Sequence, residues 1–146
     1  MKIKLLISLL FLASVSLSGL AQVRGEGVIP DGLEWQQKEK ALFVYGFYAA
    51  YMNGVMYTPS AEMANRLLKA YTHRRVRRER EYMPLLNAQD CTPHNLNTLK
   101  VTPLNTEWYE VKFQIATINP SDSMQYLVRK VRLAPKKRTY QIVEVK

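Results

Sequence analysis

Three residues of types that take part in catalysis and metal binding lie close together in the segment AQDCTPH, residues 88–94. Asp90, Cys91 and His94 supply a carboxylate, a thiol and an imidazole, and Cys91 is the only cysteine of the chain. A thiolate nucleophile needs a base within hydrogen-bond reach and a third group that orients the base. Because such partners usually come from separate elements, the segment favours a structural loop, in which Asp90 accepts hydrogen bonds from a turn and Cys91 packs as a small residue.

A metal site at this segment lacks ligands. Cys91 and His94 provide two, whereas a structural zinc site uses four protein ligands and a catalytic site three plus a water. His73 is the only other histidine. We therefore expect neither a metal nor another cofactor, and a single cysteine predicts no internal disulfide.

A second chemistry to consider is proton transfer in a pocket lined by tyrosines. It needs a carboxylate with a pKa raised by burial, together with tyrosine or acid donors to an oxyanion. Tyrosines at helical or strand spacing are more often core residues with their hydroxyls at the rim. The candidate residues for such a pocket and its loop are Tyr48, Tyr51, Gln89, Asp90, Trp108 and Tyr109.

The run HRRVRRERE, residues 73–81, is the strongest indication of a binding surface. It holds five arginines between residues 74 and 80. Guanidinium groups bind phosphate, sulfate or carboxylate through two hydrogen bonds. The alternative is a solvated helix end, where cations complement the helix dipole and pair with nearby glutamates. The candidate binding residues are Arg74, Arg77 and Arg78.

The first 21 residues have the pattern of a secretory signal peptide. A positively charged start precedes an apolar run over residues 5–17, and Gly19 and Ala21 place small residues before the cleavage position. We expect export to the periplasm or the medium. The mature chain, residues 22–146, should form one domain with its core at about residues 35–146, and no later segment is long and apolar enough to span a membrane.

Charge narrows the list of partners. The chain carries 21 Lys+Arg and 12 Asp+Glu, and without Lys2 and Lys4 of the leader the balance is 19 − 12 = +7. Such a charge often indicates nucleic acid. An exported protein does not normally meet nucleic acid, so we expect instead an anionic glycan, a lipid headgroup or an acidic protein surface.

Two segments have helical periodicity, one before the arginine run and one that leads into it. In KALFVYGFYAAYMNG, residues 40–54, apolar side chains recur at helical spacing and Gly54 is the expected end. Ser60 is the expected N-cap of a second helix, which reaches the arginines if it runs far enough. On that helix one basic stripe would comprise Arg66, Lys69, His73, Arg77 and Arg80. A loop is expected over about residues 81–97.

The rest of the chain has the alternation of strands. WYEVKFQIATI (108–118), MQYLVRKVRL (124–133) and TYQIVEV (139–145) are separated by the turn segments NPSDS and PKKR, and LKVTP (99–103) is a further short strand. Two or three helices followed by such a meander predict an α+β domain with the helices on one face of an antiparallel sheet. The outer face would carry Lys112, Lys130 and Arg132.

Several of these segments together resemble a known family. FYAAY (47–51), NAQD (87–90), LKVTPL (99–104) and WYEVKF (108–113) are similar to exported bacterial proteins of the domain of unknown function 3828, over roughly Ala41 to Val145. The resemblance implies a cystatin-like, nuclear-transport-factor-2-like cone, in which helices pack into a curved antiparallel sheet. It implies no reaction, because this fold hosts several functions. The family often has an acidic residue shortly before the Gln-Asp pair, whereas here Glu81 lies further back.

Taken together, the patterns predict an exported module that binds an acidic protein or an anionic ligand of the cell envelope, rather than an enzyme. An immunity-type protein is one form of this function. The alternative is a small-molecule enzyme or a lipid-binding cone with a tyrosine-lined pocket. A pocket that encloses a desolvated carboxylate would favour the enzyme, and a filled interior with a flat basic face would favour binding.

Overall fold

A computed structural model describes residues 28–57, 61–78, 85–86, 91–115 and 125–146. The expected signal peptide, the Ser60 cap, the 119–123 turn and the loop residues Gln89 and Asp90 lie outside these ranges. The helices and strands are α2 (Trp35–Met56), α3 (Ala61–Tyr71), α4 (Arg74–Arg78), α5 (Pro93–Asn97), β1 (Lys100–Pro103), β2 (Trp108–Gln114), β3 (Tyr126–Lys136) and β4 (Thr139–Val145).

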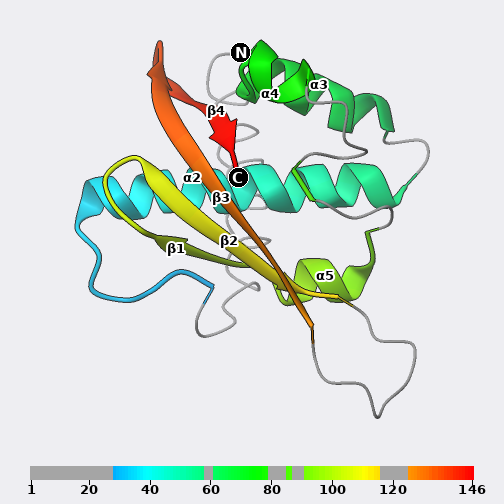
Figure 1. Ribbon diagram of the computed structural model, residues 1–146, viewed down its shortest axis with the longest axis horizontal. Coiled ribbons are helices and arrows are strands. Elements are labelled where there is room, and N and C mark those ends of the chain that lie inside the picture. Colours follow the sequence, from blue (N-terminus) through cyan, green and yellow to red (C-terminus); the bar gives the residue numbers. More distant parts are fainter. Residues whose placement is uncertain (1–27, 58–60, 79–84, 87–90, 116–124) are drawn as a thin grey trace, which may run out of the picture.

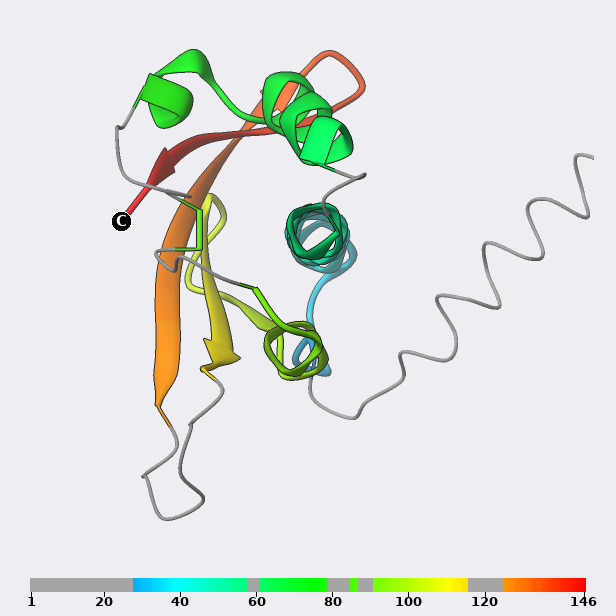
Figure 2. The same ribbon diagram turned by 90° about the vertical axis from the view of Figure 1, so that its right-hand side faces the viewer.

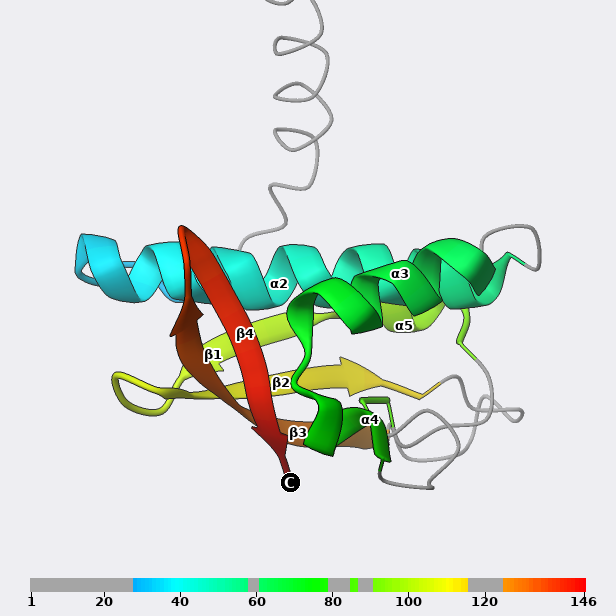
Figure 3. The same ribbon diagram turned by 90° about the horizontal axis from the view of Figure 1, so that it is seen from above.

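The four strands form one antiparallel sheet in the order β1-β2-β3-β4 (Figure 1). Helices α2, α3 and α5 lie on one face of this sheet, which we call the inner face, and α4 lies beside β4 in the layer of the sheet (Figure 2). Seen from above, α2 extends along the inner face with α3 next to it (Figure 3). The predicted α+β architecture, helices on one face of an antiparallel sheet, is therefore confirmed.

Helix α2 is longer than the sequence pattern indicated. It begins at Trp35 and continues through Gly54 to Met56, so the expected end at Gly54 is wrong. A Cβ atom at position 54 would lie 3.2 Å from the backbone nitrogen and the Cβ of Ala64. The glycine thus allows α3 to pack closely against α2, and it serves packing rather than helix termination.

No helix among the described residues is both long and apolar enough to cross a bilayer.

The condition for one basic stripe, a second helix that runs through the arginines, is not met. Helix α3 ends at Tyr71, and Thr72 then forms a parallel bridge with Ile142 of β4. The backbone N–H of His73 donates to the Ile142 carbonyl at 2.8 Å. A hydrogen bond to the strand therefore replaces the next helical one, and the arginines belong to a separate short helix, α4.

A short helix, α5, occupies part of the segment expected to be a loop. The Thr92 side chain accepts a hydrogen bond from the Asn95 backbone, while the Asn95 side-chain oxygen accepts one from the Thr92 backbone at 2.6 Å. Pro93 occupies the first turn, where its missing N–H costs nothing. The Asn95 amide also donates to the Gln114 carbonyl at 2.6 Å, so this capping box anchors α5 to β2.

The core lies between α2 and the inner face of the sheet. Tyr109, Val111 and Phe113 of β2 alternate inward, as their period of two predicts, and Ile115 follows the end of the strand at 36% exposure. The buried side chains that α2 contributes are those of Ala41, Val44, Phe47, Tyr48, Tyr51 and Met52.

Candidate functional site

Cys91 has the environment of an unreactive thiol. Its side chain is half-buried, and burial raises the pKa of the thiol to about 11, although a hydrogen bond from the Thr92 backbone acts in the opposite direction. The thiol therefore keeps its proton at neutral pH, whereas nucleophilic cysteines need a lowered pKa. His94 lies exposed on α5. Asp90, the proposed third member, lies outside the described residues.

The described part of the chain holds no group of three His, Cys, Asp or Glu side chains that could bind a metal ion. The two histidines belong to different elements, His94 to α5 and His73 to the link between α3 and α4. The His73 Nδ1 atom accepts a hydrogen bond from the Arg75 backbone at 3.3 Å.

Tyr48 and Trp108, two of the residues considered for a pocket, lie on opposite sides of the sheet. The Tyr48 side chain extends from α2 into the core, is fully buried, and donates a hydrogen bond to the Leu85 carbonyl at 3.1 Å. Trp108 lies on the other face of the sheet, where it is directly opposite Arg132 in the strand register. The two side chains therefore do not line a common pocket.

Among the described residues, no buried carboxylate accompanies the tyrosines of the interior. Tyr109 is fully buried, and within the described residues its hydroxyl makes no hydrogen bond. Burial, and then the neighbouring Tyr140, raises the pKa of Tyr109 to about 12. The buried polar residues in the described ranges are Thr72 and Asn95. These ranges thus offer no buried acid for proton transfer.

Arg129 faces inward from β3 and was not among the candidate residues predicted from the sequence. It lies opposite Val111 in the register and is half-buried. Burial raises the pKa of Tyr48, and the positive charge of Arg129 partly offsets this effect. The period of two in LVRKV contained the signal, because Arg129 alternates with the inward residues Leu127 and Val131.

The outer face of the sheet combines cations with aromatic rings. The Nζ atom of Lys112 lies 4.2 Å from the centre of the Tyr126 ring, and that of Lys146 lies 4.7 Å from the centre of the Trp108 ring. The guanidinium carbon of Arg132 lies 6.0 Å from the centre of the same tryptophan ring. Such geometry is that of cation–π contacts. In Figure 1 this face is turned toward the viewer, with β3 in front of α2.

The strand register places the basic residues predicted for the outer face, Lys112, Lys130 and Arg132, on the same face as further cations and aromatic residues. We define the outer sheet face by Lys100, Trp108, Glu110, Lys112, Tyr126, Val128, Lys130, Arg132, Glu144 and Lys146. The carboxylate of Glu144 lies 3.1 Å from the Nε atom of Arg132 and 3.2 Å from the Nζ atom of Lys146. Hydrogen bonding by Lys146 is the largest cause that lowers the pKa of Glu144. Five cations against two carboxylates leave the face positively charged.

The candidate arginines lie next to this face. Arg74 and Arg77 are exposed on α4, while Val76 is buried and α4 packs against β4. Arg77 and Lys69, two members of the expected basic stripe, line the same hollow of about 220 Å³ between α3 and α4. Arg78 belongs to α4, and its side chain lies outside the described residues.

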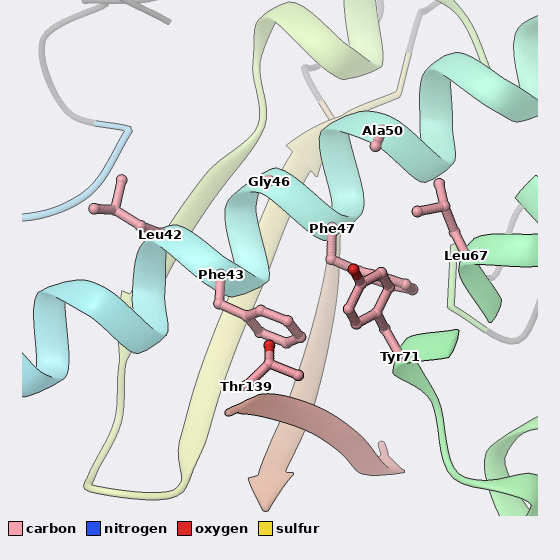
Figure 4. A pocket seen from close by; sticks show the side chains of 8 residues that line it. All are labelled: Leu42, Phe43, Gly46, Phe47, Ala50, Leu67, Tyr71 and Thr139. Carbon is pink, nitrogen blue, oxygen red and sulfur yellow. The ribbon is translucent and has the colours of Figure 1, made fainter. Parts of the chain in front are cut away.

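A groove that no sequence pattern predicted lies between α2, α3 and the start of β4 (Figure 4). Its volume is about 310 Å³. We call it the apolar groove, and its lining residues are Leu42, Phe43, Gly46, Phe47, Ala50, Leu67, Tyr71 and Thr139. It encloses no carboxylate. The available sequence signal was Leu42, an apolar residue outside the helically spaced apolar set of this segment.

The sequence matches no protein-family model, and no curated protein is similar enough to count as a match. A crystal structure of a protein of unknown function from Bacteroides thetaiotaomicron VPI-5482 is similar to this chain. The two share 20% sequence identity with a TM-score of 0.65, over 92% of this chain and 98% of the other. At this identity the similarity concerns the fold alone.

Proposed function

We propose that this protein is an exported, non-catalytic module that binds an acidic partner in the cell envelope through the outer sheet face. The observation that carries the proposal is the character of this face, which is basic, aromatic and uncovered by α2, α3 and α5. An immunity-type protein, which neutralises an effector by binding it, is one concrete form of this function.

The physical properties of the face suit protein recognition. Tyrosine, tryptophan and arginine are the residues that most often dominate binding energy at interfaces. Trp108 and Tyr126 supply rigid rings on adjacent strands, and Arg132 is held by Glu144. The surrounding lysines would mainly speed the encounter with an acidic surface and exclude basic ones. The exposed arginines of α4 would extend the same positive field past β4.

The interior favours binding over catalysis. Within the described ranges the space between α2 and the sheet is filled by apolar and aromatic side chains. Neither the buried polar residues nor the lining of the apolar groove includes a carboxylate. The proposal of export rests on the leader-like residues 1–21.

A comparative pull-down from a periplasmic extract tests the proposal. Wild type, a face variant (Lys112→Gln with Lys130→Gln) and a control (Lys38→Gln with Arg66→Gln) would be used side by side, with captured proteins identified by mass spectrometry. Both variants lose the same charge, and Lys38 of α2 and Arg66 of α3 are exposed away from the outer sheet face. We expect a protein that wild type and control retain and the face variant loses.

A salt titration of the captured complex completes the test. Binding by the wild type should weaken as salt rises, and the face variant should bind less tightly with a smaller dependence on salt. If the face variant retains the same proteins as the control, or no acidic protein or anionic ligand is captured, the outer sheet face is not the binding surface.

A further inference from the structure

The apolar groove is built like a ligand site and is unrelated to the outer sheet face. The rings of Phe43 and Tyr71 meet edge to face with centroids 5.8 Å apart, and Phe47 lies 6.4 Å from Tyr71. Leu42 at the rim is 48% exposed. A volume of about 310 Å³ with predominantly apolar lining falls in the range of small-molecule sites.

The glycine in this groove has no packing explanation. A glycine in the middle of a helix lowers helix stability relative to alanine. At Gly54 the close approach of Ala64 accounts for it, but a Cβ atom at Gly46 would meet nothing within 4 Å. Gly46 and Ala50 follow Leu42 at steps of four residues along α2, and the small side chains at these positions keep the groove open (Figure 4).

A basic hollow adjoins the groove at Thr139, which lines both. This second hollow, of about 490 Å³, carries Lys40, Lys137 and Arg138. Its one carboxylate, that of Glu39, accepts a hydrogen bond from the Tyr140 hydroxyl at 3.3 Å.

Tyr140 links the two hollows, because its ring contacts that of Phe43 with centroids 5.6 Å apart. Lys40 donates to the Thr106 carbonyl at 2.9 Å, while Lys137 and Arg138 at the β3–β4 turn are exposed. The apolar groove therefore continues into a region with three cations and one carboxylate.

We propose that the apolar groove binds the hydrocarbon chain of a fatty acid and that the basic hollow binds its carboxylate. An aromatic and aliphatic groove contributes affinity for a chain through burial of methylene groups. The adjoining cations favour an anionic head, and the Arg138 guanidinium offers two parallel donors to a carboxylate. A neutral or cationic amphiphile would gain nothing from the basic hollow.

Calorimetric titration of the mature chain with decanoate, below its critical micelle concentration, tests the proposal. We expect saturable binding at one site. Octanoate should bind about 16-fold more weakly, at roughly fourfold for each of the two lost methylenes. Decanol should bind more weakly than decanoate, decyltrimethylammonium more weakly still, and acetate should show no binding.

Two variants locate the site. Gly46→Leu places a side chain in the groove where space is open and raises helix propensity, so the variant should fold and lose at least tenfold in decanoate affinity. Asn53→Leu adds the same side chain at an exposed position of α2 outside the groove and should bind normally. Arg138→Gln should weaken binding of decanoate and leave decanol unchanged.

Three outcomes would overturn the proposal. They are unchanged decanoate affinity in Gly46→Leu, equal affinities for decanoate and decyltrimethylammonium, and the absence of saturable binding by the wild type. None of them bears on the outer sheet face, which the pull-down and salt titration test separately.

Discussion

The Tyr48 hydroxyl donates a hydrogen bond to the carbonyl oxygen of Leu85, 3.1 Å away, and both residues are fully buried. This bond ties the middle of α2 to the turn at residues 85–86. Tyr48→Phe would leave the Leu85 carbonyl buried without its donor, which costs about 1–3 kcal/mol. We expect urea denaturation to show a loss of free energy of unfolding in this range.

Tyr109→Phe is the matched comparison. The Tyr109 hydroxyl is buried and makes no hydrogen bond within the described residues, so its removal should change the free energy of unfolding by less than about 1 kcal/mol, in the stabilising direction. A loss as large as that of Tyr48→Phe would mean that the Tyr109 hydroxyl has a bonding partner.

Cys91 should react slowly with iodoacetamide at neutral pH, because burial raises the pKa of its thiol to about 11. The folded state keeps this proton at a pH where the unfolded thiol has lost it. Stability should therefore be fully present below the unfolded pKa, near 9, and fall as the pH rises toward 11. Cys91→Ala should reduce this alkaline loss. Rapid labelling of the folded protein at pH 7 would instead revive the nucleophile hypothesis.

The two glycines of α2 should respond differently to alanine. Gly46→Ala should raise the free energy of unfolding by about 0.5–1 kcal/mol through helix propensity. At Gly54 the added Cβ would lie 3.2 Å from Ala64, and overpacking costs about 1–3 kcal/mol. Gly54→Ala should thus be the less stable variant in thermal unfolding. Equal stabilities would show that α3 moves away from α2 at little cost.

Arg74→Ala combined with Arg77→Ala should barely change stability, because both side chains are exposed and such charges contribute about 0–1 kcal/mol. If α4 extends the binding surface, the double variant should bind the captured partner more weakly, with a smaller salt slope. Unchanged affinity and slope would confine binding to the sheet.

Cleavage after Ala21 is expected on export, because small residues precede Gln22 at the end of the apolar run. N-terminal sequencing of the protein recovered from the periplasm or the medium checks this. A recovered chain that keeps Lys2, or that begins beyond Gly27, would place the boundary elsewhere.

The sequence was most informative where structure depends on local periodicity. Alternation in β2 placed Tyr109, Val111 and Phe113 inside. The same alternation assigns Trp108 to the outer face, so its assignment to a pocket with Tyr48 conflicted with a signal already available.

Predictions failed where a distant segment decides the outcome. The helix breaks at Thr72 because Ile142, far along the chain, supplies a competing hydrogen-bond acceptor. Gly54 lies within α2 rather than at its end, and Ala64 of α3 packs against it. The apolar groove likewise joins α2, α3 and the start of β4, whose proximity no local pattern encodes.

The hydrogen bond between His73 and Ile142 also affects how open the β4 edge is to strand pairing with another chain. A sheet edge with free N–H and C=O groups is a template for another strand. Here β4 bonds to the Thr72–His73 segment. Strand β1 is only four residues long and ends at Pro103, and its Val101 N–H donates a hydrogen bond to the Val28 carbonyl. Both borders are thereby partly closed to strand addition. Strand addition at these borders is therefore disfavoured, so copies of the chain should resist edge-to-edge polymerisation, and the binding proposed for the outer sheet face would use side chains rather than an added strand.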